Sequence, residues 1–282
     1  MGPVSDEAGQ AFRVGDVECL RIPDGVVDYA SSELFLDVSP DVLRAAGIGA
    51  TGTLVYSPLL IRTAGPLVLV DAGTGPELAK EWDLPSGHAV DALAAASVSP
   101  EEIDVVAVSH GHPDHVGGLS VADGAGRVPT FPRARIVVSR REWEFFTGPD
   151  GLAYDADDAE VFRTRLEPSR EAGLLDLVDP GEEIAPGVRF VSAPGHTPGH
   201  CGVEIASEGE RAVYIGDAML HPVEVEHPEW TGASDYDRTL TEATRRELLR
   251  LAAADGRTWI TFHFDTIGTI ERSGDGYRYV TD

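Results

Sequence analysis

The sequence SHGHPDH at residues 109–115 contains the side chains best suited to chemistry. Three of the chain's nine histidines and one aspartate fall within six residues here, namely His110, His112, Asp114 and His115. The segment directly follows Ile103–Val108, an apolar run typical of a buried strand. Because a strand that ends in a short loop of imidazoles and a carboxylate can direct several ligands at one point, we predict a metal site.

Three further residues of the same kinds occur later in the chain. His196 and Asp217 each follow a strand-like run, and His263 lies within another. Seven such side chains are too many for one tetrahedral ion, but they suit two divalent ions that share a ligand. Asp217 is the candidate bridge. Imidazole and carboxylate ligands favour Zn²⁺, and iron, manganese and cobalt are also compatible.

Strands and helices must position these side chains, and strands predominate. Strands are predicted at 17–22, 53–61, 66–70, 103–108, 135–138, 187–192, 201–206, 211–215 and 259–264. Helices are predicted at 91–96, 139–146, 155–166 and 239–254, with a terminal hairpin over 267–280. We therefore expect two sheets packed together, with helices outside.

The domain organisation is predicted to be simple, because no linker rich in proline and serine divides the chain. Residues 1–50 are expected to form an N-terminal tail and arm, followed by the main part of a single domain at 51–282. Within the arm, the apolar run Leu34–Leu36 stands in a polar setting. It is a candidate lid or a candidate contact in a homodimer.

Composition excludes several classes of partner. The 282 residues carry a formal net charge of −26, and Lys80 is the single lysine. Nucleic acids and anionic membranes require cationic patches, so we expect neither as a partner and favour a small-molecule substrate. Two cysteines do not make a disulfide framework, and neither a secretory signal nor a membrane-spanning stretch is visible, so a cytoplasmic location is expected.

The order of the candidate ligands resembles the HxHxDH pattern of metallo-β-lactamase-fold hydrolases, over roughly residues 51–265. This resemblance implies an α/β (α+β) fold, a four-layered αβ/βα sandwich with metals at one edge. By the same resemblance, one metal is held by His110, His112 and His196. The other is held by Asp114, His115 and His263, with Asp217 as the bridge.

The segments VDAGTG, PGHTPGH and GDAMLHP look most like the methyl-parathion-hydrolase-like and lactonase-like branch. The short lactonases carry a tyrosine three residues after the bridging aspartate, where this chain has Leu220. The resemblance implies a dinuclear hydrolase whose metal-bridging hydroxide cleaves a small ester, lactone or phosphotriester, with Asp114 as the catalytic proton acceptor. The alternatives are a thioesterase of a biosynthetic pathway and a mononuclear-iron, persulfide-dioxygenase-like enzyme.

Residues behind the ligands and around the substrate are also predicted. Asp71 ends an apolar strand and is a candidate acceptor for the second N–H of a ligating imidazole. His200 is expected to support the site by bonding to nearby backbone rather than by ligation. The predicted substrate pocket comprises Phe35, Met219, Leu220 and His221.

Overall fold

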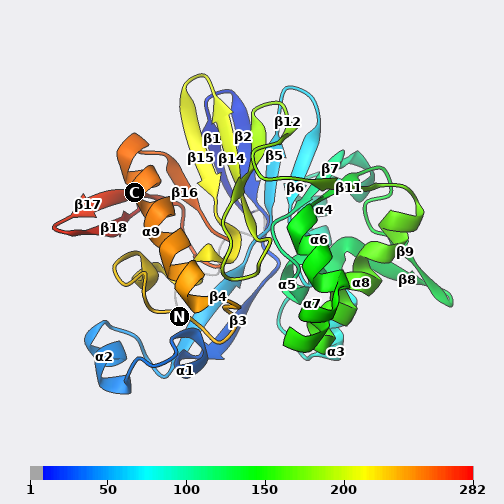
Figure 1. Cartoon of the computed structure of the whole chain (residues 1–282). Coiled ribbons are helices and arrows are strands. Elements are labelled where there is room, and N and C mark those ends of the chain that lie inside the picture. The colour runs from blue at the N-terminus through cyan, green and yellow to red at the C-terminus, as the bar shows by residue number, and fades with distance from the viewer. Residues whose placement is uncertain (1–8, 282) are drawn as a thin grey trace.

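Two seven-stranded sheets form the centre of the computed structural model, which describes residues 9–281 (Figure 1). The first sheet contains, in spatial order, β1 (Gln10–Val14), β2 (Val17–Arg21), β5 (Leu59–Arg62), β6 (Leu67–Val70), β7 (Val105–Val108), β10 (Arg135–Ser139) and β11 (Leu175–Val178). The second contains β12 (Glu183–Ala185), β13 (Val188–Ser192), β14 (Cys201–Ser207), β15 (Glu210–Tyr214), β16 (Thr258–Ile260), β17 (Gly268–Ser273) and β18 (Gly276–Val280).

Two small sheets and the helices complete the described chain. The small sheets pair β3 (Gly25–Ala30) with β4 (Thr51–Tyr56), and β8 (Ser120–Asp123) with β9 (Gly126–Pro129). The α-helices are α1 (Ser31–Leu34), α2 (Pro40–Ala45), α3 (Pro76–Glu81), α4 (Ala89–Ala95), α5 (Pro113–Val116), α6 (Arg140–Thr147), α7 (Pro149–Tyr154), α8 (Ala156–Glu171) and α9 (Arg238–Asp255). Short 3-10 turns occupy Pro100–Glu102, Gly117–Leu119, Gly216–Ala218 and Pro222–Val225.

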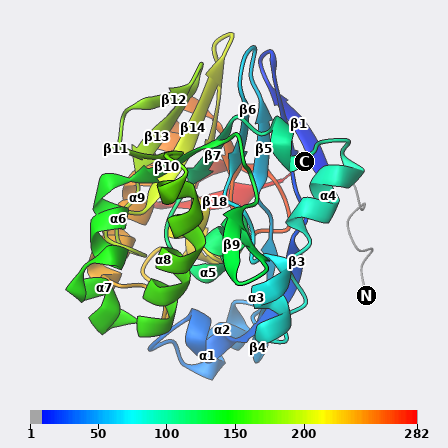
Figure 2. The same ribbon diagram turned by 90° about the vertical axis from the view of Figure 1, so that its right-hand side faces the viewer.

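Alternation of side chains along the strands produces four layers. In β7, Val105 and Ala107 face the second sheet, while Val106 and Val108 face the helices. Helices α4, α6 and α8 cover the outer face of the first sheet, and α9 covers that of the second (Figures 1 and 2). All four residues of β7 are buried, as a parallel strand covered on both faces requires. The predicted fold class, an αβ/βα sandwich, is confirmed.

Two predicted strands are shorter than expected. The run predicted at 53–61 is divided at Ser57 and Pro58, and its two parts belong to different sheets. Proline has no N–H to donate to a sheet, which explains the break. The run predicted at 259–264 stops being a strand at Ile260, so His263 lies in a loop. The helices α3 and α7 were not predicted.

The segment expected to be a tail and arm is built into the sheets where the structure describes it. β2 pairs with β5, and β3 pairs with β4, so residues on both sides of position 50 share sheets. Leu34 and Phe35 are buried and belong to the main hydrophobic core cluster. The predicted tail at residues 1–8 lies outside the described residues. Within residues 9–281, no helix has both the length and the hydropathy needed to cross a membrane.

Candidate metal centre

The predicted ligands converge at one edge of the sandwich because they follow the carboxyl ends of strands. β7 leads into the loop 109–112 and then into α5. In the second sheet, β13, β15 and β16 run in the same direction, since two antiparallel pairings join β13 to β15 and a parallel pairing joins β15 to β16. These three strands lead into His196, Asp217 and His263, respectively.

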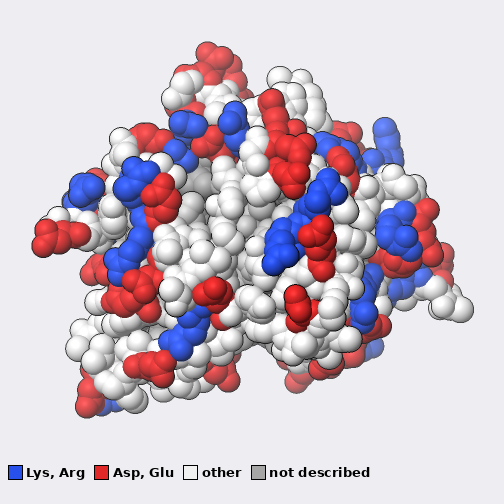
Figure 3. All heavy atoms as spheres, in the orientation of Figure 1, with Lys and Arg blue, Asp and Glu red and all other residues white. Residues whose placement is uncertain are grey.

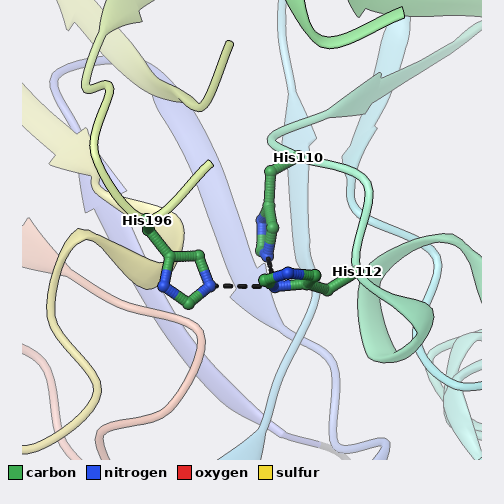
Figure 4. Close-up of side chains that lie close together, drawn as sticks. All are labelled: His110, His112 and His196. Carbon is green, nitrogen blue, oxygen red and sulfur yellow. Dashed lines mark hydrogen bonds between the residues drawn. The ribbon is translucent and has the colours of Figure 1, made fainter. Parts of the chain in front are cut away.

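The first group of ligands consists of three buried imidazoles (Figure 4). Nε2 of His110 lies 3.0 Å from Nδ1 of His112, and the same Nδ1 lies 2.9 Å from Nε2 of His196. Ligand atoms of the three residues all lie within 4.8 Å of one another. His112 therefore faces the group with Nδ1, while its neighbours use Nε2.

The second group consists of Asp114, His115, Asp217 and His263, again with ligand atoms within 4.8 Å of one another. Nε2 of His263 lies 3.0 Å from Oδ2 of Asp217 and 3.6 Å from Oδ2 of Asp114. Nε2 of His115 lies 3.2 Å from Oδ1 of Asp217. Two imidazoles and two carboxylates thus face one point.

The carboxylate of Asp217 touches both groups. Its Oδ2 lies 3.5 Å from Nε2 of His196 and 3.8 Å from Nε2 of His110, in addition to its contact with His263. Its Oδ1 faces His115. His110 and His115 also bring the two groups together, with ring centroids 4.0 Å apart, but Asp217 is the one carboxylate among residues 9–281 that belongs to one ligand group and lies against imidazoles of the other. A carboxylate in this position can be shared by two ions.

The residues fit divalent metal ions. Nε2 of His115 and Oδ1 of Asp217 are buried and have no hydrogen-bond partner in the described chain, a costly arrangement without a shared cation. In the first group, neighbouring nitrogens are 2.9 and 3.0 Å apart. A tetrahedral zinc site with Zn–N bonds of about 2.0–2.1 Å separates its nitrogens by roughly 3.3 Å. Only a small outward movement would accommodate an ion.

The protonation states of His110, His112 and Asp217 also favour ligation. Burial lowers the pKa of His110 well below its ordinary value and that of His112 to about 3, so both imidazoles are neutral at neutral pH. Burial alone would raise the pKa of Asp217, but His115 and His263 hold it well below its ordinary value. Neutral imidazoles and ionised carboxylates are the forms that bind metal. Burial alone would lower the pKa of His115, but the carboxylates of Asp217 and Asp114 raise it well above its ordinary value, so a metal ion there would displace a proton.

Asp71 and His200 hold the site from behind. Oδ2 of Asp71 lies 2.8 Å from Nδ1 of His115, which leaves Nε2 of that imidazole facing the site. Asp71 also accepts hydrogen bonds from Ser109 and from the hydroxyl of Tyr214. His200 donates from Nδ1 to the carbonyl of Ala193 and accepts at Nε2 from the backbone N–H of Asp217, so it positions the bridge and does not face the ion sites.

Sequence reasoning missed two buried carboxylates. Oδ1 of Asp235 lies 3.0 Å from Nδ1 of His196, so Asp235 orients the imidazole of His196 as Asp71 orients that of His115. Glu142, on α6, accepts from the backbone of Gly111 and Gly199 and from the hydroxyl of Thr197. It therefore joins the two ligand loops.

A sequence signal existed for one of them. Glu142 shares a helix face with Phe145 and Phe146, at spacings of three and four residues, and a carboxylate on an apolar face requires a buried role. The loop around Asp235 shows no comparable pattern.

The family model for the metallo-beta-lactamase superfamily matches residues 51–263, the part of the chain that holds all the candidate ligands. The chain belongs to the metallo-beta-lactamase superfamily. Membership in this superfamily confirms the predicted resemblance.

Individual relatives of this superfamily member support the lactonase-like branch. N-acyl homoserine lactonase AiiB of Agrobacterium fabrum is 27% identical over 248 residues, which is 78% of this chain and 84% of AiiB. Hydrolase AbOPH is 26% identical, with a TM-score of 0.85 and 96% of each chain covered. AidC, a dizinc quorum-quenching lactonase, shares the fold with a TM-score of 0.83 over 97% of each chain, at 23% identity. The chain spans 42% and 64% of the lengths of two other curated relatives.

A cavity of about 490 Å³ opens onto the candidate metal centre of this metallo-beta-lactamase-fold chain. Both ligand groups reach its floor, through His112 and His196 on one side and Asp114 and His263 on the other. Apolar walls come from Leu34, Leu54, Trp82, Leu84 and Leu220. The site therefore combines reactive ligands with space for a small organic molecule.

Leu220 is the one predicted pocket residue that lines this cavity. Met219 is fully buried in the core between the second sheet and α9. Phe35 and His221 pack against each other, with Phe35 also against Trp230, behind the cavity wall. The chain is extended at Met219, so consecutive side chains point to opposite sides, and the cavity receives Leu220 alone.

Proposed function

We propose that this chain is a dinuclear metal-dependent hydrolase of small, uncharged esters and lactones, with phosphotriesters as a related substrate class. The single observation that carries the proposal is the carboxylate of Asp217 lying against both ligand groups at the floor of one cavity. Two divalent cations at such a site supply a water of lowered pKa as nucleophile and polarise the substrate's carbonyl or phosphoryl oxygen. Zinc is the metal that we propose.

The two ligand groups assign the residues to two cations. His110, His112 and His196 would hold one cation, and Asp114, His115 and His263 would hold the other, with Asp217 available to both. Asp71, Asp235 and His200 fix the orientation of His115, His196 and the backbone of Asp217, respectively.

Asp114 is also the proposed proton acceptor. Its side chain is 19% exposed, whereas that of Asp217 is 4% exposed, and it faces the cavity. Burial alone would raise the pKa of Asp114, but His115 and His263 lower it, so the carboxylate is ionised at neutral pH. It can therefore accept a proton from the attacking water and return it to the leaving group.

The charges around the cavity favour uncharged substrates. Besides the ligands, Glu33, Asp155 and Asp158 line the cavity, and none of its lining residues is a lysine or arginine. An anionic substrate would meet repulsion without a compensating cation from the protein. On the face in Figure 3, basic side chains lie among acidic ones and form no continuous basic surface. AiiB, which matches most of this chain, is named as a lactonase, which supports a neutral lactone as substrate.

Activity and metal content should be measured on the same preparations. We expect about two metal ions per chain, and hydrolysis of N-acyl homoserine lactones or aryl esters that chelators abolish. Acyl thioesters and organophosphate triesters complete the substrate panel. Hydrolysis confined to thioesters would favour the alternative thioesterase, whereas one iron per chain with oxygen consumption would overturn the proposal in favour of a sulfur-oxidising enzyme.

A further inference from the structure

Two tyrosines on the cavity wall form a pair that the proposed ligand chemistry does not use. Tyr29 lies in β3 and Tyr56 ends β4, and both line the cavity. Their hydroxyl groups are hydrogen-bonded to each other. The pairing register sets Tyr29 opposite Gly52 and Tyr56 opposite Gly25, so both rings stand on the same face of this two-stranded sheet.

The pair lies beside the second ligand group. The ring of Tyr56 contacts that of His263 edge-on, with centroids 5.2 Å apart. The backbone carbonyl of the preceding residue, Val55, accepts a hydrogen bond from Nδ1 of His263 at 3.1 Å. The strand that carries one tyrosine therefore also orients a proposed metal ligand, and the pair is held beside the second ligand group.

The direction of the hydrogen bond follows from burial. The side chain of Tyr56 is almost fully buried, and its hydroxyl has no partner other than Tyr29 in the described chain. If Tyr29 were the donor, the proton of Tyr56 would be buried without an acceptor, which costs about 1–3 kcal/mol. We therefore assign Tyr56 as the donor, which leaves the proton of Tyr29, the more exposed of the two, free to be donated into the cavity.

A tyrosine hydroxyl carries one proton that it can donate, and its oxygen can itself accept a hydrogen bond. The outward-facing hydroxyl is consequently a donor, and a hydroxyl that itself accepts a hydrogen bond is a stronger donor.

We propose that Tyr29, supported by Tyr56, donates a hydrogen bond to a carbonyl oxygen of the bound substrate. The receiving group is an uncharged acceptor, because the carboxylates around the cavity repel an anion. This assignment rests on the proposed function and specifies one wall of its substrate site: β3 and β4 supply the donor, and the metal centre faces it from the floor.

The experiment compares Tyr29→Phe, Tyr56→Phe and the double variant with the wild-type enzyme. Binding of an N-acyl lactam, an uncharged analogue that resists hydrolysis, is measured by calorimetry, together with KM and kcat for the lactone. We expect Tyr29→Phe to weaken lactam binding and raise KM by about 5–10-fold, with metal content unchanged. Tyr56→Phe should weaken lactam binding less than Tyr29→Phe does. The double variant should bind the lactam as Tyr29→Phe does, because the hydroxyl of Tyr56 acts on the substrate only through that of Tyr29.

A matched control is Tyr236→Phe, since Tyr236 is 45% exposed, is absent from the cavity lining and has no hydroxyl partner in the described chain. Lactam binding by Tyr29→Phe at wild-type strength would overturn the donor assignment while leaving the proposed function intact. Loss of lactam binding in Tyr29→Phe, in an enzyme that hydrolyses no ester or lactone, would support the donor assignment and refute the proposed function. A wild-type enzyme that neither binds the lactam nor hydrolyses the panel refutes both.

Discussion

Replacing Asp235 with asparagine tests how the first ligand group is held. Oδ1 of Asp235 lies 3.0 Å from Nδ1 of His196, and Oδ2 accepts the backbone N–H of Gly232 at 2.8 Å. An asparagine can satisfy only one of these donors. If its oxygen faces His196, its NH₂ group opposes the N–H of Gly232. If the amide is reversed, Nδ1 of His196 must become an acceptor, and its proton moves to Nε2, the nitrogen that faces the site.

Both outcomes weaken metal binding, and the size of the effect follows from the lost contact. Removing a carboxylate that orients a ligating imidazole typically reduces metal affinity 10–100-fold, which is about 1.4–2.7 kcal/mol. A buried donor left without a partner lowers the free energy of unfolding by about 1–3 kcal/mol. We therefore expect Asp235→Asn to fold, to bind the first ion more weakly and to have correspondingly lower activity.

The assay is competition for zinc with a chromogenic chelator, alongside thermal unfolding with and without metal. Asp237→Asn is the matched control: Asp237 caps α9 by accepting the N–H of Leu240, and asparagine caps helices equally well. Wild-type zinc affinity in Asp235→Asn would refute the reasoning, as would an equal loss in the control.

Four further predictions concern the shared carboxylate, Glu142 behind the ligand loops and the two buried thiols. Asp217→Ala should reduce metal content at one or both sites and abolish hydrolysis, measured by atomic emission and turnover, and full retention of both would exclude the bridge. Glu142→Ala should lower the free energy of unfolding by about 2–4 kcal/mol in denaturant titrations, because two buried amides and a hydroxyl lose their acceptor. Burial raises the pKa of Glu142 from 4.5 to about 7, so the native state binds a proton that the unfolded chain releases. Stability should then fall as pH rises across that interval, and Glu142→Gln should remove this slope; parallel curves for the two proteins would contradict it. Cys19 and Cys201 are buried, and burial raises the pKa of each thiol to about 12, so neither should react with a thiol reagent until the protein unfolds.

Much of the site was predictable because its information is local. Asp114 and His115 come directly after the first two histidines, and the strand before them sets their position at the sheet edge. His196 and Asp217 also follow strands, and the carboxyl ends of strands that run in the same direction meet at one edge. The position of a ligand directly after a strand therefore predicts that it lies at this edge, even when the packing of the sheets is unknown.

The pocket was not predictable in the same way. Met219 and Leu220 are adjacent and both apolar, yet one fills the core and the other lines the cavity. The apolar run at residues 34–36 was a candidate lid or dimer contact, but Leu34 and Phe35 pack in the hydrophobic core beside β3 and β4. Local composition cannot distinguish these environments, because burial depends on which distant segment packs against each side chain.

By itself, the sequence determined the superfamily, the ligand types and their order, since these follow from residue identity and spacing along strands. Only the tertiary structure decided what surrounds the ligands. Asp235 reaches His196 across 39 residues, Glu142 reaches Gly111 across 31, and the two tyrosine hydroxyls meet across 27. No periodicity encodes such contacts, because they exist only after the two sheets and their helices have packed.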